Sequence, residues 1–563
     1  MAKRSPLEAL LTAKERPRSN SLYVQPEGAP PQNLRQLLLG QRIGSRSSVL
    51  NSRMAVNQDV SIHWFRLDCL RLHDNPALFH SLTAQTVRCV FILDPLCFKD
   101  RNRGPSATVW QFLLESLRDL DSKLRKSPYN SRLFVFKGEP TVILPRLIRH
   151  WKATMLTYQA SQSSYETFKY DNIIANVARA NGAKVECPFG HTLFNPDTLK
   201  QAFGNNTASS VKEFISAVGS LVPSPPVPQP SPCHIVPLSS NTPTSESMEP
   251  LVPGEVPIPT MDELGFTAEE TVRMESWIGG ETQALSRLLN YCCEDHEDKN
   301  MLNWLLSKES LSPYFRFGCL SVRLFYARVQ QYTSNTNEGH KFFCRVKRNL
   351  LLREYSYHLA MATPNFDKQK DNPLCLPIHW ESENDLVERV VKGKTGIPWI
   401  DAVMIQITKE GWAHYLARKC VACFLTRGCL WQSWECGKAI FSKYLLDYED
   451  PICVMCWMED ACAGFISGKI ESYSPCKFGQ LMDPEGIYIT TYLPVLRNFP
   501  PEYIHEPWTA PRSIQEEAGC IIGVDYPNPI VDVEEKERIC KARLKEFFVS
   551  LANNMTPSSP NIS

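Results

Sequence analysis

The chain has 563 residues, of which 43% are hydrophobic, and this length is enough for two domains with separate cores. Its 61 Lys and Arg balance 60 Asp and Glu, so net charge does not draw the protein as a whole to nucleic acid or to an anionic membrane. No run approaches the roughly 18 consecutive apolar residues of a membrane span, which argues against an integral membrane protein.

Twenty cysteines are scattered along the chain without paired metal-ligand spacing, and no secretory signal precedes them. This usage indicates reduced thiols in a cytosolic or nuclear setting, and it predicts neither a metal site nor a disulfide framework. Residues 1–57 are Ser-rich and basic, which predicts a disordered extension. An organelle transit peptide is the alternative interpretation, although three Glu weigh against it.

Short apolar runs alternate with helical stretches over residues 58–200. Strands are expected at 61–65, 87–93, 133–137 and 155–158, with an amphipathic helix at 110–124. This alternation predicts an α/β domain built on a doubly wound parallel sheet. No Gly-rich phosphate loop follows the strands, so the sheet by itself does not indicate bound NAD or ATP.

The character of the chain changes twice after residue 200. Residues 201–262 are rich in Pro, Ser and Thr, which predicts a linker. Residues 263–552 carry successive amphipathic helical patterns separated by Gly and Pro, which predict an all-α domain that holds most of the tryptophans. Residues 553–563 are expected to be a short polar tail, with little room for a regulatory extension.

Short sequence blocks recur in a recognisable order through both predicted domains. The first domain contains HWFR at 63–66 and LRLHDNPAL at 70–78, which by themselves are typical of a strand end and a helix cap. The helical domain contains SLSPYFRFGCLS at 310–321, GIPWID at 396–401, GWAH at 411–414, WQSWE at 431–435, LPVL at 493–496 and HEPW at 505–508. Together these blocks resemble the cryptochrome and photolyase family, and most of all its animal cryptochrome branch, with some insect-type features.

The resemblance implies a photolyase-like fold in which the all-α domain binds FAD. Ser312 and Asn349 match polar residues that contact the cofactor in this family. Lys308 and Glu309 stand where the family usually has small hydroxyl residues, and of these two only the lysine is suited to a phosphate. The resemblance identifies no antenna pigment, because animal cryptochromes often lack one.

Four further residues match the surroundings of the flavin ring. Arg418 and Asp447 correspond to an ion pair beside the isoalloxazine, although an ordinary inter-helix ion pair is the simpler alternative. Glu449 stands where the family usually has a second Asp. Cys453 matches the position that faces flavin N5, where a weakly acidic thiol would leave the photoreduced flavin negatively charged. By itself, Cys453 is equally typical of a packed core thiol.

Tryptophans in the matching blocks correspond to the family's electron-transfer chain. Trp457 matches the member nearest the flavin, Trp434 the middle member and Trp380 the outer member, and Trp431 matches a fourth member found in animal cryptochromes. A single tryptophan is more often a core side chain than an electron carrier. Four tryptophans in matching blocks favour the electron-transfer role.

Three positions depart from what DNA repair requires in this family. Tyr415 and Lys419 stand where one class of photolyase has two histidines that move protons to the lesion, and only the preceding His414 remains. Glu459 replaces a tryptophan that stacks on a flipped base in the other class. These departures predict that the protein does not repair DNA.

The leading hypothesis is a cryptochrome-type blue-light photoreceptor in the nucleus, the cytoplasm or both. Photoreduction of FAD through the tryptophans would shift nearby helices and so signal to clock or transcription-regulating partners. One alternative is a light-dependent DNA photolyase, which would be an enzyme, and another is a light-independent repressor or scaffold. Under the leading hypothesis the protein is not an enzyme and binds DNA only weakly.

Overall fold

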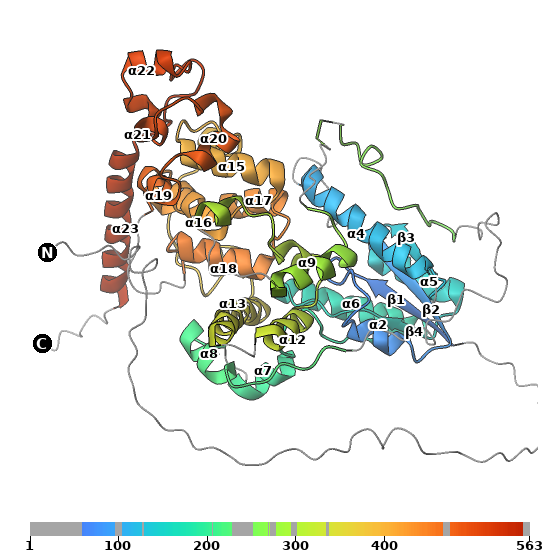
Figure 1. Cartoon of the computed structure of the whole chain (residues 1–563). Coiled ribbons are helices and arrows are strands. Elements are labelled where there is room, and N and C mark those ends of the chain that lie inside the picture. The colour runs from blue at the N-terminus through green and yellow to red at the C-terminus, as the bar shows by residue number, and fades with distance from the viewer. Residues whose placement is uncertain are drawn as a thin grey trace, which may run out of the picture. The chain divides into compact units, whose positions relative to one another are not determined.

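The fold is known from a computed structural model that describes residues 59–95, 104–126, 129–204, 207–227, 252–267, 269–270, 277–293, 301–333, 337–464 and 473–555. Within these ranges an α/β part is followed by a helical part (Figure 1). The basic extension expected at 1–57, and residues 556–563 of the expected tail, lie outside the described residues.

The sheet has five parallel strands in the order β3-β2-β1-β4-β5. The strands are β1 (Val60–Phe65), β2 (Thr86–Leu93), β3 (Leu133–Lys137), β4 (Met155–Thr157) and β5 (Lys184–Glu186). The predicted parallel sheet is therefore confirmed. The fifth strand was not predicted, because its three residues form no apolar run.

Both faces of the sheet are covered, which explains the apolar runs in its strands. Along β1, Ile62 and Trp64 belong to one buried cluster and Phe65 belongs to the other, as the alternation of strand side chains requires. Buried residues of α2 and α4 lie in the cluster with Phe65, and those of α5 and α6 lie in the cluster with Ile62. These helices are α2 (Pro76–Ser81), α4 (Ala107–Arg125), α5 (Pro140–Trp151) and α6 (Tyr165–Ala180).

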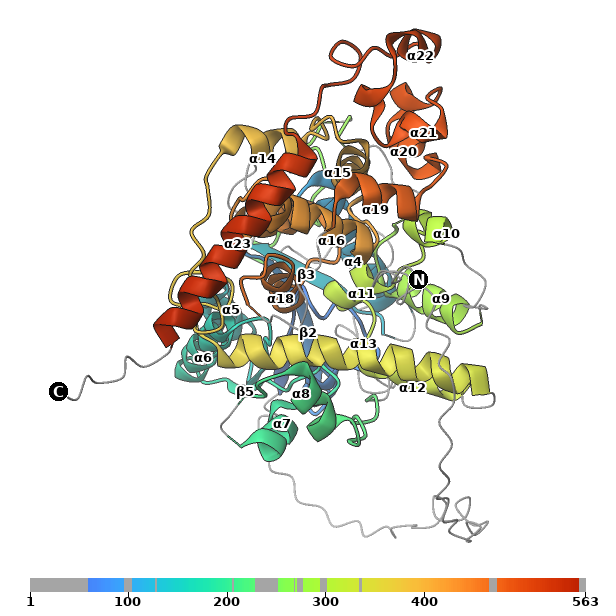
Figure 2. The ribbon, with the colours of Figure 1, turned by 90° about the vertical axis from the view of Figure 1, so that its left-hand side faces the viewer.

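The segment expected to be a linker begins with ordered helices. Helix α7 (Pro196–Phe203) leads to α8 (Val211–Val218), where Ser210 Oγ accepts the Glu213 N–H at 3.2 Å and caps the helix. Phe214 is completely buried, and Figure 2 shows α7 and α8 beside α13. The sequence did not predict α8, because its few apolar residues stand among many Pro and Ser residues, and that composition is typical of a linker. Residues 228–251 lie outside the described part of the chain.

The rest of the described chain is helical, as predicted, and none of its helices is long and apolar enough to cross a membrane. A π-helical turn at Phe424–Gly428 separates α16 from α17. The helices are α9 (Glu281–Cys293), α10 (Met301–Leu306), α11 (Ser312–Arg316), α12 (Val322–Thr333), α13 (Asn337–Ala362), α14 (Asn384–Val391), α15 (Pro398–Glu410), α16 (Tyr415–Cys423), α17 (Trp434–Tyr444), α18 (Asp450–Asp460), α19 (Pro475–Met482), α20 (Ile487–Tyr492), α21 (Pro501–Ile504), α22 (Arg512–Glu517) and α23 (Val533–Met555).

The loop after β1 joins the α/β part to the helical part. Asp74 is fully buried, and its carboxylate accepts bonds from Arg323 Nη2 at 2.7 Å, Arg323 Nε at 3.0 Å and the Ser321 hydroxyl. Arg71 donates to the Gly318 carbonyl at 3.0 Å. Gly318 has a φ of 60°, and a Cβ there would lie 1.9 Å from the Asp68 carbonyl oxygen, so only glycine fits this approach.

This joint occupies the place where a nucleotide would bind in many doubly wound sheets. The strand order reverses between β1 and β4, and such sheets bind ligands beyond the carboxyl ends of the strands at that point. Here the Leu70 N–H donates to the Phe317 carbonyl at 3.1 Å, so a segment of the helical part lies against the loop after β1. The LRLHDNPAL block therefore serves docking as well as the helix cap that Asn75 makes for α2.

Replacing Asp74 by Ala tests how strongly this joint stabilises the protein. The change leaves Arg323 buried without its partner, so the free energy of unfolding is expected to fall by about 3–5 kcal/mol in urea denaturation. Glu516→Ala is the control, because it removes an exposed ion pair with Arg512 and is expected to cost less than about 1 kcal/mol. Equal losses in both variants would show that the buried pair does not hold the two parts together.

Candidate functional site

Arg418 and Asp447 form the centre of the candidate site. Arg418, on α16, donates from Nη1 and Nη2 to the two carboxylate oxygens of Asp447, each at 2.9 Å. Its Nε donates to the Ala413 carbonyl at 2.6 Å. The two side chains are 16% and 8% exposed, so the pair is largely shielded but not sealed from solvent. A guanidinium held at three points is a rigid donor, as recognition of a fixed ligand requires.

Ser312 and Trp412 extend this pair into a polar cluster. The Ser312 hydroxyl, on the first residue of α11, donates to Asp447 Oδ2 at 2.6 Å. The indole Nε1 of Trp412 donates to the same hydroxyl at 3.3 Å, and Arg418 lies over the Trp412 ring at 5.6 Å. The sequence predicts no role for Trp412 beyond its place in the GWAH motif. A shielded indole N–H needs a hydrogen-bond acceptor, and that need could have indicated a polar partner for Trp412.

One face of α18 lies beside this cluster. Cys453, Cys456 and Trp457 share that face because they are three and four residues apart. Burial, together with the nearby Asp447 carboxylate, raises the pKa of Cys453 well above its usual value. Cys456 is accessible to solvent, yet the protein packed around it raises the pKa of its thiol to about 12.

Glu449 and Asn349, which were also expected to contact the cofactor, lie elsewhere. Glu449 accepts bonds from Arg353 at 2.8 Å and from the Tyr357 hydroxyl, and its carboxylate lies 3.0 Å from His191 Nε2; all of these side chains are buried. Burial opposes ionisation, but these partners hold the pKa of Glu449 below its usual range. Asn349 is exposed on α13. The structure therefore brings Ser312, Arg418, Asp447 and Cys453 together and places Glu449 in a separate network.

The clustered residues suit a flavin. Its ring has a polar edge, which matches the guanidinium, carboxylate and hydroxyl of the cluster, and it is an electron acceptor, which matches the adjacent indole of Trp457. Lys308, considered above for a phosphate, forms an ion pair with Glu410 at 3.1 Å, and both Lys308 and Glu309 are exposed. Within the described residues no group of three or more potential ligands is placed to hold a metal ion.

Trp457 and Trp434 come together through a glycine on α17. Trp434, Gly437 and Phe441 share one face of that helix, and a Cβ on Gly437 would lie 2.0 Å from the Trp457 ring. The Trp457 ring also meets Phe441 edge-on, at 4.9 Å between centroids. Trp457 therefore packs directly on α17, one turn from Trp434. Both rings are buried, and neither Nε1 has a hydrogen-bond partner among the described residues, although the thiol of Cys375 lies near Trp434.

Trp380 and Trp431 form a second, outer pair with ring centroids 5.2 Å apart. Trp380 is half-buried and donates from Nε1 to Gln369 at 2.7 Å, and Trp431 donates from Nε1 to the His379 carbonyl at 2.9 Å. Trp431 has a φ of 52°, which is rare for a bulky residue and costs about 1–3 kcal/mol. Backbone hydrogen bonds on both sides of Trp431 hold it in this conformation.

The positions linked to DNA repair lie next to the Arg418–Asp447 cluster. Lys419 makes an ion pair with Asp460 at 3.4 Å and lies over the Tyr473 ring at 5.5 Å. Burial raises the pKa of Asp460 to about 7 even though Lys419 opposes the shift. Burial also lowers the pKa of His414 to about 4, so its imidazole is neutral at physiological pH. Tyr415 is 63% exposed. No pair of imidazoles able to exchange protons stands at these positions.

Family models match two parts of the chain. The model described as DNA photolyase matches residues 61–232, and the model described as the FAD binding domain of DNA photolyase matches residues 346–546. The second match contains Arg418, Asp447, Cys453 and the four tryptophans of the two pairs.

Similar proteins include vertebrate cryptochromes. Cryptochrome-2 of Gallus gallus is 39% identical over 504 residues, which cover 87% of this chain and 84% of the relative. Cryptochrome-1 of Rattus norvegicus is 38% identical over 523 residues, which cover 90% and 86%. Among solved structures, a Synechocystis cryptochrome aligns with a TM-score of 0.74 at 24% identity, covering 86% of this chain and 99% of that one. A class III photolyase from Agrobacterium tumefaciens also gives 0.74 at 24%, covering 89% and 100%. At this identity, the two structures establish a shared fold.

Substituting Gly437 tests the packing of Trp457 on α17. Gly437→Ala puts a methyl group into the Trp457 ring, so the free energy of unfolding is expected to fall by about 1–3 kcal/mol in urea denaturation. Ser442→Ala, later on the same helix, is the control and is expected to change stability by no more than about 1 kcal/mol. If Gly437→Ala is as stable as the wild type, Trp457 does not pack against this helix.

Proposed function

This chain belongs to the cryptochrome and photolyase family, and on that basis we propose that it is a cryptochrome-type blue-light photoreceptor whose tryptophans supply an electron to bound FAD. The observation that carries the proposal is an unbroken series of neighbouring side chains from the polar cluster to the tryptophans. Cys453 lies beside Asp447, and Trp457 shares the same face of α18. Trp457 covers Gly437 of α17, which is one helical turn from Trp434. FAD, when bound, supplies the absorption of blue light and a ring that accepts an electron.

Ser312, Arg418 and Asp447 would hold the polar edge of the flavin ring. Their mutual bonds of 2.6 to 2.9 Å fix each group before a ligand binds, which lowers the entropy cost of binding. We assign Asn349 to a cofactor contact from α13 on the resemblance alone. Cys453 retains its proton at physiological pH because its pKa is raised, so it is a poor proton donor. Negative charge gained in the site would therefore persist beside Arg418.

The tryptophans would carry the electron vacancy outward, because their hydrogen bonds differ along the chain. Within the described residues, the buried Nε1 atoms of Trp457 and Trp434 have no oxygen acceptor. An oxidised indole at either position would therefore keep its proton and take an electron from the next tryptophan. Trp380 and Trp431 both donate to oxygen acceptors, and Trp380 is partly exposed to water. Proton loss from an oxidised indole is thus favoured at the outer pair, Trp380 and Trp431. It would slow the return of the electron from the flavin to that pair.

Glu449, which we keep as a cofactor contact on the resemblance, would also transmit the change in charge. It lies two residues from Asp447 and holds Arg353 of α13 together with His191 of the α/β part. A new charge beside Asp447 acts on this buried network through a low local dielectric. The signal would be a shift between two populated arrangements of these elements. We propose clock or transcription-regulating proteins as partners, in the nucleus, the cytoplasm or both.

Removing Trp457 tests the photoreceptor directly. In the FAD-loaded protein, blue light is expected to bleach the oxidised flavin absorption, and Trp457→Phe is expected to abolish most of this bleaching because the nearest donor is gone. Trp399→Phe is the matched control, because Trp399 is a buried tryptophan that packs on Tyr488 and Phe478, outside the proposed chain. Absorption spectra recorded in darkness and under illumination measure the effect.

Two outcomes of this experiment would contradict the proposal. Equal bleaching in the wild type and Trp457→Phe would exclude this tryptophan as the donor. Bound flavin that light leaves unchanged in the wild type would favour the alternative function, a light-independent repressor or scaffold that retains the fold.

DNA repair is expected to be absent. The Lys419–Asp460 ion pair and the charge of Glu459 occupy positions that repair requires for proton transfer and stacking. With reduced FAD and blue light, the protein should leave pyrimidine dimers and six-four photoproducts in an oligonucleotide unchanged, while an active photolyase treated identically restores its substrate. Light-dependent restoration above the dark control would establish the photolyase alternative.

A further inference from the structure

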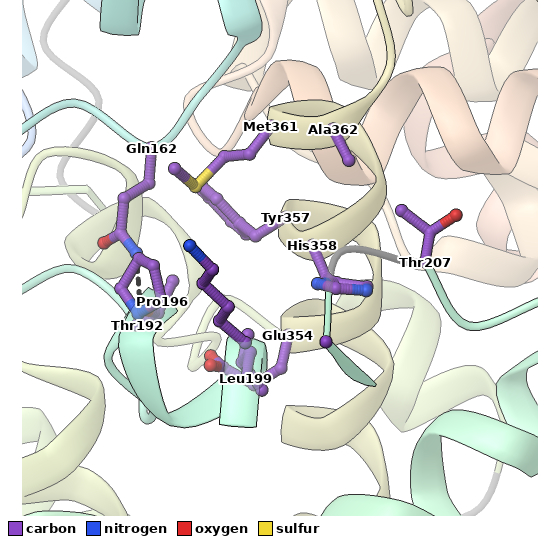
Figure 3. Close-up of a pocket in the computed structure, with 12 residues that line it drawn as sticks. Gln162, Thr192, Pro196, Leu199, Thr207, Glu354, Tyr357, His358, Met361 and Ala362 are labelled. Atoms are coloured by element: carbon purple, nitrogen blue, oxygen red, sulfur yellow. Dashed lines mark hydrogen bonds between the residues drawn. The ribbon is translucent and has the colours of Figure 1, made fainter. Parts of the chain in front are cut away.

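A small cavity lies between α13 and the segment that leads out of the α/β sheet. Its volume is about 180 Å³. Gln162 and Thr192 line it from the α/β side, and Glu354, Tyr357 and Met361 line it from α13 (Figure 3). None of the clustered flavin-site residues lines this cavity. It is therefore separate from the site proposed above.

Three polar atoms of the lining residues are buried without a hydrogen-bond partner in the part of the chain that the structure describes. They are Gln162 Oε1, Glu354 Oε1 and His358 Nε2. Gln162 and Glu354 are only 2% and 1% exposed, so bulk water does not satisfy them. Each unsatisfied group of this kind costs about 1–3 kcal/mol, and native proteins rarely tolerate several together. All three residues line this one cavity, which indicates an occupant that supplies the missing bonds.

The hydrogen bonds around the cavity show whether Gln162 and Glu354 can accept or donate a hydrogen bond to a bound molecule. Thr192 Oγ1 donates to the Phe194 carbonyl at 2.7 Å, so it must accept the bond from Gln162 Nε2 at 2.8 Å. This orientation leaves Gln162 Oε1 as a free acceptor. Glu354 Oε2 accepts the Phe194 N–H at 3.2 Å, and its Oε1 is 3.7 Å from Arg353 Nη1, beyond hydrogen-bond distance. Burial raises the pKa of Glu354 to about 7, so above that pH its Oε1 is a second acceptor that lacks a hydrogen bond, with Arg353 as an ion-pair partner.

Much of the remaining wall is apolar, although Lys200, Thr207 and His358 also line it. Leu199, Met361 and Ala362 contribute aliphatic or thioether surface, and Tyr357 contributes an aromatic ring. The volume is close to that of an apolar cavity of about 150 Å³ that accommodates benzene. The space therefore suits a fused ring of about ten non-hydrogen atoms, with its faces against apolar groups and its edge towards the acceptors.

We propose that this cavity is a binding site for a small, flat, uncharged heteroaromatic molecule that donates N–H hydrogen bonds to Gln162 Oε1 and Glu354 Oε1. Lys200 and Arg353 near the site disfavour a cation. The bound molecule would also touch the network that contains Glu449, because Tyr357 lines the cavity and donates its hydroxyl to Glu449. Ordered water is the competing occupant, since at about 30 Å³ per molecule several waters fill the same volume.

Isothermal titration of the FAD-loaded full chain with aminoindazole tests this site. Aminoindazole is an uncharged bicyclic ring with several N–H donors, and indene is the matched hydrocarbon without them. Saturable binding of aminoindazole is expected, with indene binding more weakly. Gln162→Met keeps the side-chain length and removes the acceptor, so the Kd is expected to rise by about fivefold or more. Met361→Leu is the matched control and is expected to change the Kd by less than about threefold.

Filling the cavity gives an independent check. Leu199→Trp places a large ring in the same space and is expected to abolish binding, while thermal melting and the flavin spectrum verify that the variant is folded. Absence of saturable binding to the wild type at about millimolar aminoindazole would overturn the proposal and leave water as the occupant. Equal affinities in the wild type, Gln162→Met and Leu199→Trp would overturn it as well. Neither result depends on whether light reduces the flavin.

Discussion

The buried carboxylate of Asp74 is the interaction on which the arrangement of both parts depends. It sits in the loop after β1 and is neutralised by Arg323 at the start of α12, with Ser321 as an additional donor. A buried ion pair is costly to form and more costly to break, so it specifies one arrangement of the two parts more than it adds stability. The same joint closes the edge of the sheet where related architectures bind nucleotides, and this leaves the helical part to build the ligand site.

Within the helical part, close packing determines which aromatic side chains meet. Gly437 allows the Trp457 ring to lie on the surface of α17, which brings it within one helical turn of Trp434. The outer indoles are positioned differently, through backbone hydrogen bonds and the unusual conformation of Trp431. Packing thus positions the two inner tryptophans and hydrogen bonding positions the two outer ones.

A buried polar network connects the features that the two parts contribute separately. Glu449 holds His191 of the α/β part and Arg353 and Tyr357 of α13, and Tyr357 also lines the small cavity. The α/β part, helix α13 and the cavity are therefore linked by contacts between neighbouring side chains. Through these contacts, a change of charge near Glu449 or a molecule bound in the cavity can act on the other residues of the network.

The sequence by itself determined the fold class, because short apolar runs such as 61–65 and 87–93, separated by helical stretches, already encode a sheet covered on both faces. Its ordered motifs also identified Arg418 and Asp447, which the structure joins. The tertiary structure alone decided that Glu449 belongs to a network away from this pair, that α8 is folded, and that a cavity lies beside α13. The physical reason is distance along the chain. Local patterns record which face of an element is apolar, whereas partners such as His191 and Glu449 meet only after folding.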